Sequence, residues 1–240
     1  MTTGAGASSG FDRLRADPVL ATVTRLEERI AARFPQRGLL RVAAQLRVLV
    51  SDVEQAAGEA RVGRRVARWA SRVLMAAVVA ATVVLLVLAT GEALSRRGPE
   101  ETLDWLPLLE SVINDLVFAG LAAWFLWSVP ERLQRERLLR QLHRLRSLAH
   151  VIDMHQLTKD PERLRSDFRP SPASVEVDLD RAQMEAYLDY CSELFSLVGK
   201  TAALCAEQSQ DQVVLQTVST IETVTSSMSR NVWQKIQLLR

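Results

Sequence analysis

Two apolar stretches dominate the sequence: VLMAAVVAATVVLLVLATG at residues 73–91 and SVINDLVFAGLAAWFLWSV at residues 111–129. The first contains no charged residue, and the second contains only Asp115. An α-helix rises about 1.5 Å per residue, so about 20 apolar residues cross a hydrocarbon core of about 30 Å. The two stretches therefore predict a transmembrane helical hairpin, with spans at 73–91 and 108–129 and an outer loop at 92–107.

Basic residues are unevenly distributed around this hairpin. Residues 11–72 hold 13 Arg against 7 acidic residues, residues 131–169 hold 10 Lys and Arg against 6, and residues 92–115 hold 2 Arg against 6. Because cytoplasmic loops are enriched in Lys and Arg, this pattern predicts an inner-membrane protein with both termini in the cytoplasm. Tryptophan favours the membrane interface, where we expect Trp69, Trp105, Trp124 and Trp127.

The remaining segments predict an all-α protein with cytoplasmic helices. Apolar residues recur at helical spacing over most of the chain. Gly58 and Gly63 leave two alternatives before the first span, a bend or one continuous helix. The predicted segments are a disordered tail at 1–16, a helix pair at 17–70, the transmembrane hairpin at 71–130, a basic juxtamembrane helix at 131–157, a linker at 158–180 and a C-terminal antiparallel helical hairpin at 181–240.

Both helices of the C-terminal hairpin carry an apolar series at alternating steps of three and four residues. The first series runs from Met184 to Cys205, and the second runs from Val214 to Leu239. Such spacing is typical of a coiled-coil-like seam. It predicts helix packing either within one chain or between two chains.

Three polar residues lie in or beside the second span: Glu110, Asn114 and Asp115. Polar groups inside a membrane are costly and usually face protein or water. In a homo-oligomer they would form an acidic pore mouth of the kind found in cation-selective channels. The alternative is that Glu110 lies among the lipid headgroups, while Asn114 and Asp115 hydrogen-bond to a neighbouring helix.

Two groups of arginine flank the hairpin and are candidates for contact with anionic lipid. Residues 131–149 contain no aromatic side chain on which a base could stack, so we do not expect nucleic acid as a partner. Contact with a nucleotide or a protein remains the alternative for the basic helix. The candidate arginines are Arg61, Arg64, Arg65, Arg68, Arg72, Arg132, Arg135, Arg137 and Arg140.

The sequence contains no catalytic motif, and we expect no cofactor and no metal site. Gly199-Lys200-Thr201 matches the end of a phosphate-binding loop, but Leu194 stands where that loop requires its first glycine. The histidines, His143, His150 and His155, are expected to be interfacial or partly exposed. Cys191 and Cys205 are expected to be small core residues in a reducing compartment.

These features predict a non-enzymatic two-pass inner-membrane protein whose cytoplasmic helices mediate self-association or bind a partner. Only three of the 30 basic residues are Lys, an Arg bias that suggests a bacterial genome. The alternative function is a homo-oligomeric ion channel or membrane-disrupting effector, gated by the cytoplasmic helices. That plan resembles bacterial stress or anti-phage membrane effectors in architecture alone.

Overall fold

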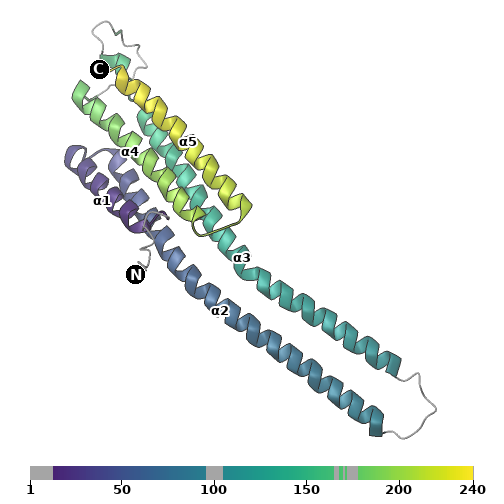
Figure 1. Ribbon diagram of the computed structural model, residues 1–240. Coiled ribbons are helices and arrows are strands. Elements are labelled where there is room, and N and C mark those ends of the chain that lie inside the picture. Colours follow the sequence, from purple (N-terminus) through teal and green to yellow (C-terminus); the bar gives the residue numbers. More distant parts are fainter. Residues whose placement is uncertain (1–12, 96–104, 165–167, 170, 172–177, 240) are drawn as a thin grey trace, which may run out of the picture. The chain divides into compact units, whose positions relative to one another are not determined.

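The computed structural model describes the chain except for residues 1–12, 96–104, 165–167, 170, 172–177 and 240. Its elements are α1 (Ala16–Arg33), α2 (Gly38–Ser95), α3 (Trp105–Leu157), the 3-10 helix η1 (Pro161–Leu164), α4 (Arg181–Ala206) and α5 (Gln212–Gln237) (Figure 1). The described residues contain no strand. The predicted all-α class is therefore confirmed for this part of the chain. Most of the predicted tail, and most of the predicted outer loop, lie outside the described residues.

Helices α2 and α3 each continue without a break for more than 50 residues. Helix α2 runs through Gly58 and Gly63 without a break, which agrees with the alternative of one continuous helix. Helix α3 likewise runs through Pro130 without a break. Each of the two helices therefore extends from a predicted span into a segment predicted to be cytoplasmic.

The chain divides into two compact units, which we describe separately. We call residues 1–57 and 135–240 the bundle, and residues 58–134 the hairpin unit. The bundle combines three segments that the sequence analysis treats as separate modules, namely the N-terminal helix pair, the basic helix and the C-terminal hairpin. Their buried apolar residues form one continuous core.

Polar contacts link each helix of the bundle to its neighbours around this core. The contacts are Glu27–Arg47 between α1 and α2, Asp52–Arg144 between α2 and α3, Gln156–Lys235 between α3 and α5, Ser192–Ser229 between α5 and α4, and Arg29–Glu193 between α4 and α1. Within the bundle, α1, α3 and α5 run in one direction, while α2 and α4 run in the other (Figure 1). Five helices thus enclose the core in a closed ring.

Local sequence signals set the start of the two C-terminal helices. The Asp180 carboxylate accepts a hydrogen bond from the Gln183 N–H at 2.7 Å, and the Gln183 side chain accepts one from the Asp180 N–H at 3.1 Å. This reciprocal capping box satisfies two backbone donors that a helix start otherwise leaves unpaired. Asp211 caps α5 in a similar way, by accepting from the N–H groups of Val213 and Val214.

The apolar series predicted from helical spacing form the buried faces of the bundle helices. On α3 the buried residues are Leu138, Leu142, Leu145, Ala149 and Ile152. The thiols of Cys191 and Cys205 are free and buried, as expected for small core residues. Burial raises the pKa of Cys205 to about 12 and also raises that of Cys191. Both thiols are therefore protonated at neutral pH and poorly reactive.

The Gly199-Lys200-Thr201 sequence is a helix-packing feature of α4. A Cβ atom at Gly199 would lie 3.0 Å from the Thr225 hydroxyl of α5, so glycine permits a close approach of the two helices. Thr201 is buried and donates to the carbonyl of Leu197 at 2.7 Å. Lys200 is exposed and donates to Ser196. The three residues lie within a regular helix, where they do not form a phosphate-binding loop.

Within the ranges that the structure describes, no helix is both long enough and apolar enough to cross a membrane. Those ranges cover each predicted span only in part. Side chains are not described at positions 85, 86, 89 and 90 of the first span, nor at 108, 109, 111, 112, 115, 119, 126, 127 and 129 of the second. The transmembrane hairpin therefore stays a prediction.

Replacement of Gly199 by leucine should destabilise the bundle, because the new side chain would press on Thr225 in a packed interface. Overpacking of this kind costs about 1–3 kcal/mol. The matched control is Gly58→Leu, since a Cβ atom at Gly58 meets nothing within 4 Å. That variant should gain up to about 1 kcal/mol from helix propensity. Thermal unfolding of the full chain measures both effects, and equal stability of the two variants would contradict the packing role of Gly199.

Candidate functional site

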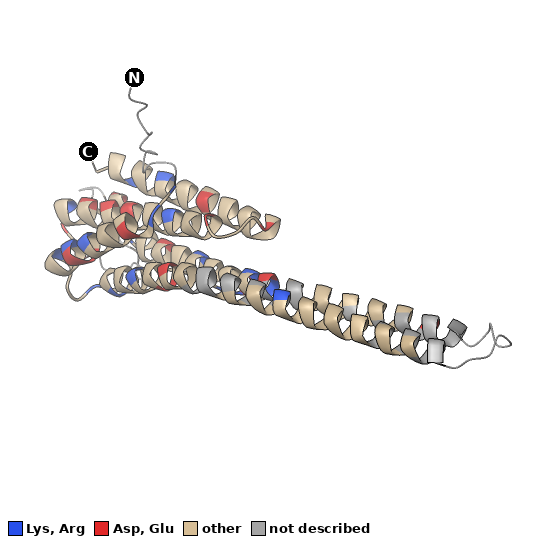
Figure 2. Ribbon diagram, turned by 60° about the horizontal axis from the view of Figure 1, so that its bottom comes forward, with Lys and Arg blue, Asp and Glu red and all other residues tan. Residues whose placement is uncertain are grey.

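Large apolar side chains are exposed on several sides of both helices of the hairpin unit. Consecutive residues of a helix point about 100° apart, yet Val73, Leu74 and Met75 are 64%, 39% and 46% exposed. Further exposed residues are Val79, Val83, Val84, Val87 and Leu88 on α2, and Ile113, Leu116, Val117, Phe118, Leu121, Trp124 and Phe125 on α3. In Figure 2 these stretches carry almost no charged residue among those described. A helix with apolar surface on several sides is usually shielded from water by protein or by a membrane.

The predicted pore-mouth residues lie on α3 in the hairpin unit. Glu110 and Asn114 are both exposed and are four residues apart, so they share one face of the helix. The Asp115 side chain lies outside the described residues. A ring of such groups requires several copies of the chain, so the pore mouth stays a prediction.

The structure divides the predicted lipid-contact arginines between the two units. Arg72 and Arg132 are exposed in the hairpin unit, whereas Arg135, Arg137 and Arg140 are exposed on the bundle part of α3. Two of the bundle residues form ion pairs within the chain, Arg135 with Asp211 at 3.6 Å and Arg140 with Glu136 at 3.5 Å. The side chains outside the described part are those of Arg61, Arg64, Arg65 and Arg68.

Two of the four predicted interface tryptophans have described side chains. Trp69 on α2 is 67% exposed, and Trp124 on α3 is 65% exposed. Both belong to the hairpin unit. The side chains of Trp105 and Trp127 lie outside the described part of the chain.

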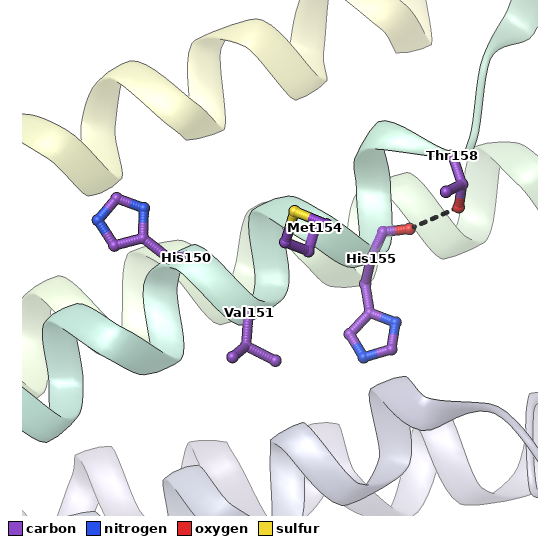
Figure 3. Close-up of a pocket in the computed structure, with 5 residues that line it drawn as sticks. All are labelled: His150, Val151, Met154, His155 and Thr158. Carbon is purple, nitrogen blue, oxygen red and sulfur yellow. Dashed lines mark hydrogen bonds between the residues drawn. The ribbon is translucent and has the colours of Figure 1, made fainter.

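A shallow hollow of about 380 Å³ lies on the bundle, near the C-terminal end of α3. Its lining comes from α3 and the residue just after it, as Figure 3 shows: His150, Val151, Met154, His155 and Thr158. The His155 ring points away from α3 toward the N-terminal helices (Figure 3). One helix face supplies the entire lining, so the hollow does not bring together groups from several elements, as binding pockets usually do.

The His155 ring packs against Gly38, the first residue of α2. A Cβ atom at Gly38 would overlap with Cε1 of this ring, so no larger residue fits there while the ring keeps its place. Burial lowers the pKa of His155, and the positive charges of Lys159 and Arg41 lower it further. The contact therefore favours a neutral imidazole.

Two of the three lysines in the chain, Lys159 and Lys235, are partly buried at the same end of the bundle. The Lys235 ammonium donates to the backbone carbonyl of Gln156 at 3.1 Å and to its side-chain oxygen at 2.7 Å. The Lys159 ammonium lies 5.7 Å from the ring centroid of Tyr187. Burial lowers the pKa of both lysines.

These lysines were missed by the sequence analysis, although one signal was available. An ammonium group is compact and can donate to several acceptors in a narrow space, whereas guanidinium is a wide planar fork. In a chain that uses arginine almost everywhere, a lysine can mark a position where that difference matters, as it does at Lys159 and Lys235. Lys159 and Lys235 connect helices of the bundle, and their contacts indicate a structural role.

No group of three or more His, Cys, Asp or Glu residues in the described part of the chain could hold a metal ion. No family model, no curated protein and no solved structure matches the chain.

Replacement of Lys235 by methionine should destabilise the bundle by about 1–3 kcal/mol, because the side-chain oxygen of buried Gln156 loses its donor. The backbone carbonyl of Gln156 keeps a second donor, the Lys159 N–H. The same replacement at exposed Lys200, which contacts only Ser196 of its own helix, should change stability by less than about 0.5 kcal/mol. Chemical unfolding of the full chain compares the two variants. A loss at Lys235 no greater than that at Lys200 would show that the contact with Gln156 is dispensable.

Proposed function

We propose that the chain is a non-enzymatic two-pass inner-membrane protein whose cytoplasmic helices mediate self-association or bind a partner. One observation carries the proposal: the helices of the hairpin unit expose large apolar side chains on several sides. Full burial of a single such side chain is worth about 1.5–3 kcal/mol. A bilayer would cover the whole set at once.

The length and the ends of the apolar stretches fit a bilayer. Residues 73–91 span about 28 Å as a helix, close to the thickness of a hydrocarbon core. Trp69 precedes the first stretch, and Trp124 lies near the end of the second, as expected for residues at a membrane interface. Arg72 directly precedes the first stretch and Arg132 follows the second; both are exposed, and both would face the cytoplasm.

The bundle would then be the cytoplasmic part of the protein. The apolar series of α4 and α5 are buried inside it, from Met184 to Cys205 and from Val214 to Ile236. The coiled-coil-like seam is thus used within the chain. Self-association or partner binding would use the outer surface of the bundle, the hairpin unit, or both.

Replacement of two exposed valines of the hairpin unit by arginine should reduce the fraction of the protein that the membrane retains. We suggest the double variant Val79→Arg/Val83→Arg, in which each arginine near a span centre costs about 2.5–3.5 kcal/mol. The matched control is Val48→Arg/Val151→Arg, which changes two valines that are similarly exposed on the bundle. Alkaline carbonate extraction measures the fraction that stays in the membrane. If alkaline carbonate extracts the unmodified protein from the membrane, or if the membrane retains both variants equally, the proposal is wrong.

A second function, a homo-oligomeric channel or membrane-disrupting effector, is favoured by one observation. Glu110 and Asn114 are exposed on one face of α3, beside an otherwise apolar stretch. In a ring of copies, the carboxylates would attract cations to the mouth of a pore. The bundle would then hold the sensor that opens it.

Single-channel recording in planar bilayers tests this alternative. Glu110→Gln should lower the selectivity for cations over anions, because it removes negative charge from the mouth. Glu28→Gln, an exposed site on the bundle, should leave the selectivity unchanged. A protein that carries no current at any voltage or pH, or an identical selectivity in both variants, would argue against a channel.

A further inference from the structure

The contact between His155 and Gly38 joins two segments that lie far apart in the sequence. Gly38 begins α2, just after the short turn that connects α1 to α2. His155 lies in the last turn of α3. Its ring occupies the space that a side chain at position 38 would need. The imidazole therefore holds the start of α2 against the end of α3.

The surroundings of the ring are positively charged. Helix α2 carries no acidic residue in its first turn, and the N-terminal end of a helix dipole repels a cation. Arg41 on α2 and Lys159 after α3 both add positive charge next to the ring. Arg37 in the turn lies close enough to Lys159 to lower the pKa of that lysine.

The nearby acidic groups are engaged elsewhere. Asp178 pairs with Arg37 at 3.1 Å. Asp153 accepts a hydrogen bond from the Gln156 side chain at 2.8 Å, and together with Asp160 it favours the charged form of Lys235 on α5. The C-terminal end of α3 favours a cation at His155. Burial, Arg41, Lys159 and the positive end of α2 oppose it, with no carboxylate among the groups that perturb His155.

We propose that the His155–Gly38 contact is an acid-sensitive latch that releases the α1–α2 turn from α3 when the imidazole is protonated. The neutral ring packs on the helix start, whereas the charged ring is repelled from it. Release would expose the ends of two bundle helices while the core of the bundle stays folded. This regulation is independent of whether the hairpin unit enters a membrane.

The direction of the pH effect follows from the position of the ring. The pKa of His155 is lower in the closed contact than its ordinary value of about 6.5. The closed state therefore binds fewer protons than the open state, so the latch is fully closed above pH 6.5 and weakens as the pH falls. At one pH unit below the ordinary pKa, the closed state can lose up to about tenfold in its equilibrium constant.

Amide hydrogen exchange of the full chain measures the latch directly. We expect the protection of residues 34–41, corrected for the intrinsic pH dependence of exchange, to fall by up to about tenfold between pH 7.5 and pH 5.5. Protection of the core of α4, around Phe195, should stay constant. Unchanged protection of residues 34–41 at the lower pH would overturn the proposal.

Three variants separate His155 from other titrating groups. His155→Gln should remove the pH dependence, while His150→Gln, an exposed site on the same helix, should retain it. Arg41→Gln should reduce the loss at pH 5.5, because it removes one charge that repels the protonated ring. If His155→Gln loses protection with acid as much as the unmodified chain does, another group is responsible and the latch is wrong.

Discussion

The bundle depends on the burial of one face of α3 between segments that precede and follow it by many residues. Leu138, Leu142 and Leu145 of this face are essentially inaccessible to water. Contacts from Arg144 to Asp52 and from Gln156 to Lys235 connect α3 to α2 on one side and to α5 on the other. Without α3, neither of these two connections could form, and the ring of five helices would stay open.

Helical spacing in the sequence was sufficient to identify which face of each helix is buried. The series from Met184 to Cys205 on α4 and from Val214 on α5 were both predicted, and both lie on buried faces. The same spacing does not state which helix covers a given face, because any apolar stripe of matching width can serve. For that reason the sequence predicts the N-terminal helix pair, the basic helix and the C-terminal hairpin as three separate segments, whereas their buried residues form one core in the structure.

The residues that the sequence could not explain are those defined by contacts between distant segments. Gly199 looked like the remnant of a phosphate-binding loop, yet its role is to admit the Thr225 hydroxyl. Gly38 follows Pro35 in a short segment that predicts a helix end, but that pattern does not reveal its contact with a histidine more than 100 residues away. The candidate residues of the hairpin unit are different: they were found through hydropathy and charge, and only several copies of the chain could bring them together in one site.

The long sequence separation within the bundle has a consequence for protein synthesis. Arg29 of α1 pairs with Glu193 of α4, 164 residues later. At about 5–20 residues per second, the ribosome needs roughly 10–30 s to add those residues. During that interval the apolar face of α1 has no α4 to pack against. The nascent N-terminal helices must therefore remain in a partly open state, accessible to chaperones, until the C-terminal hairpin emerges and closes the ring.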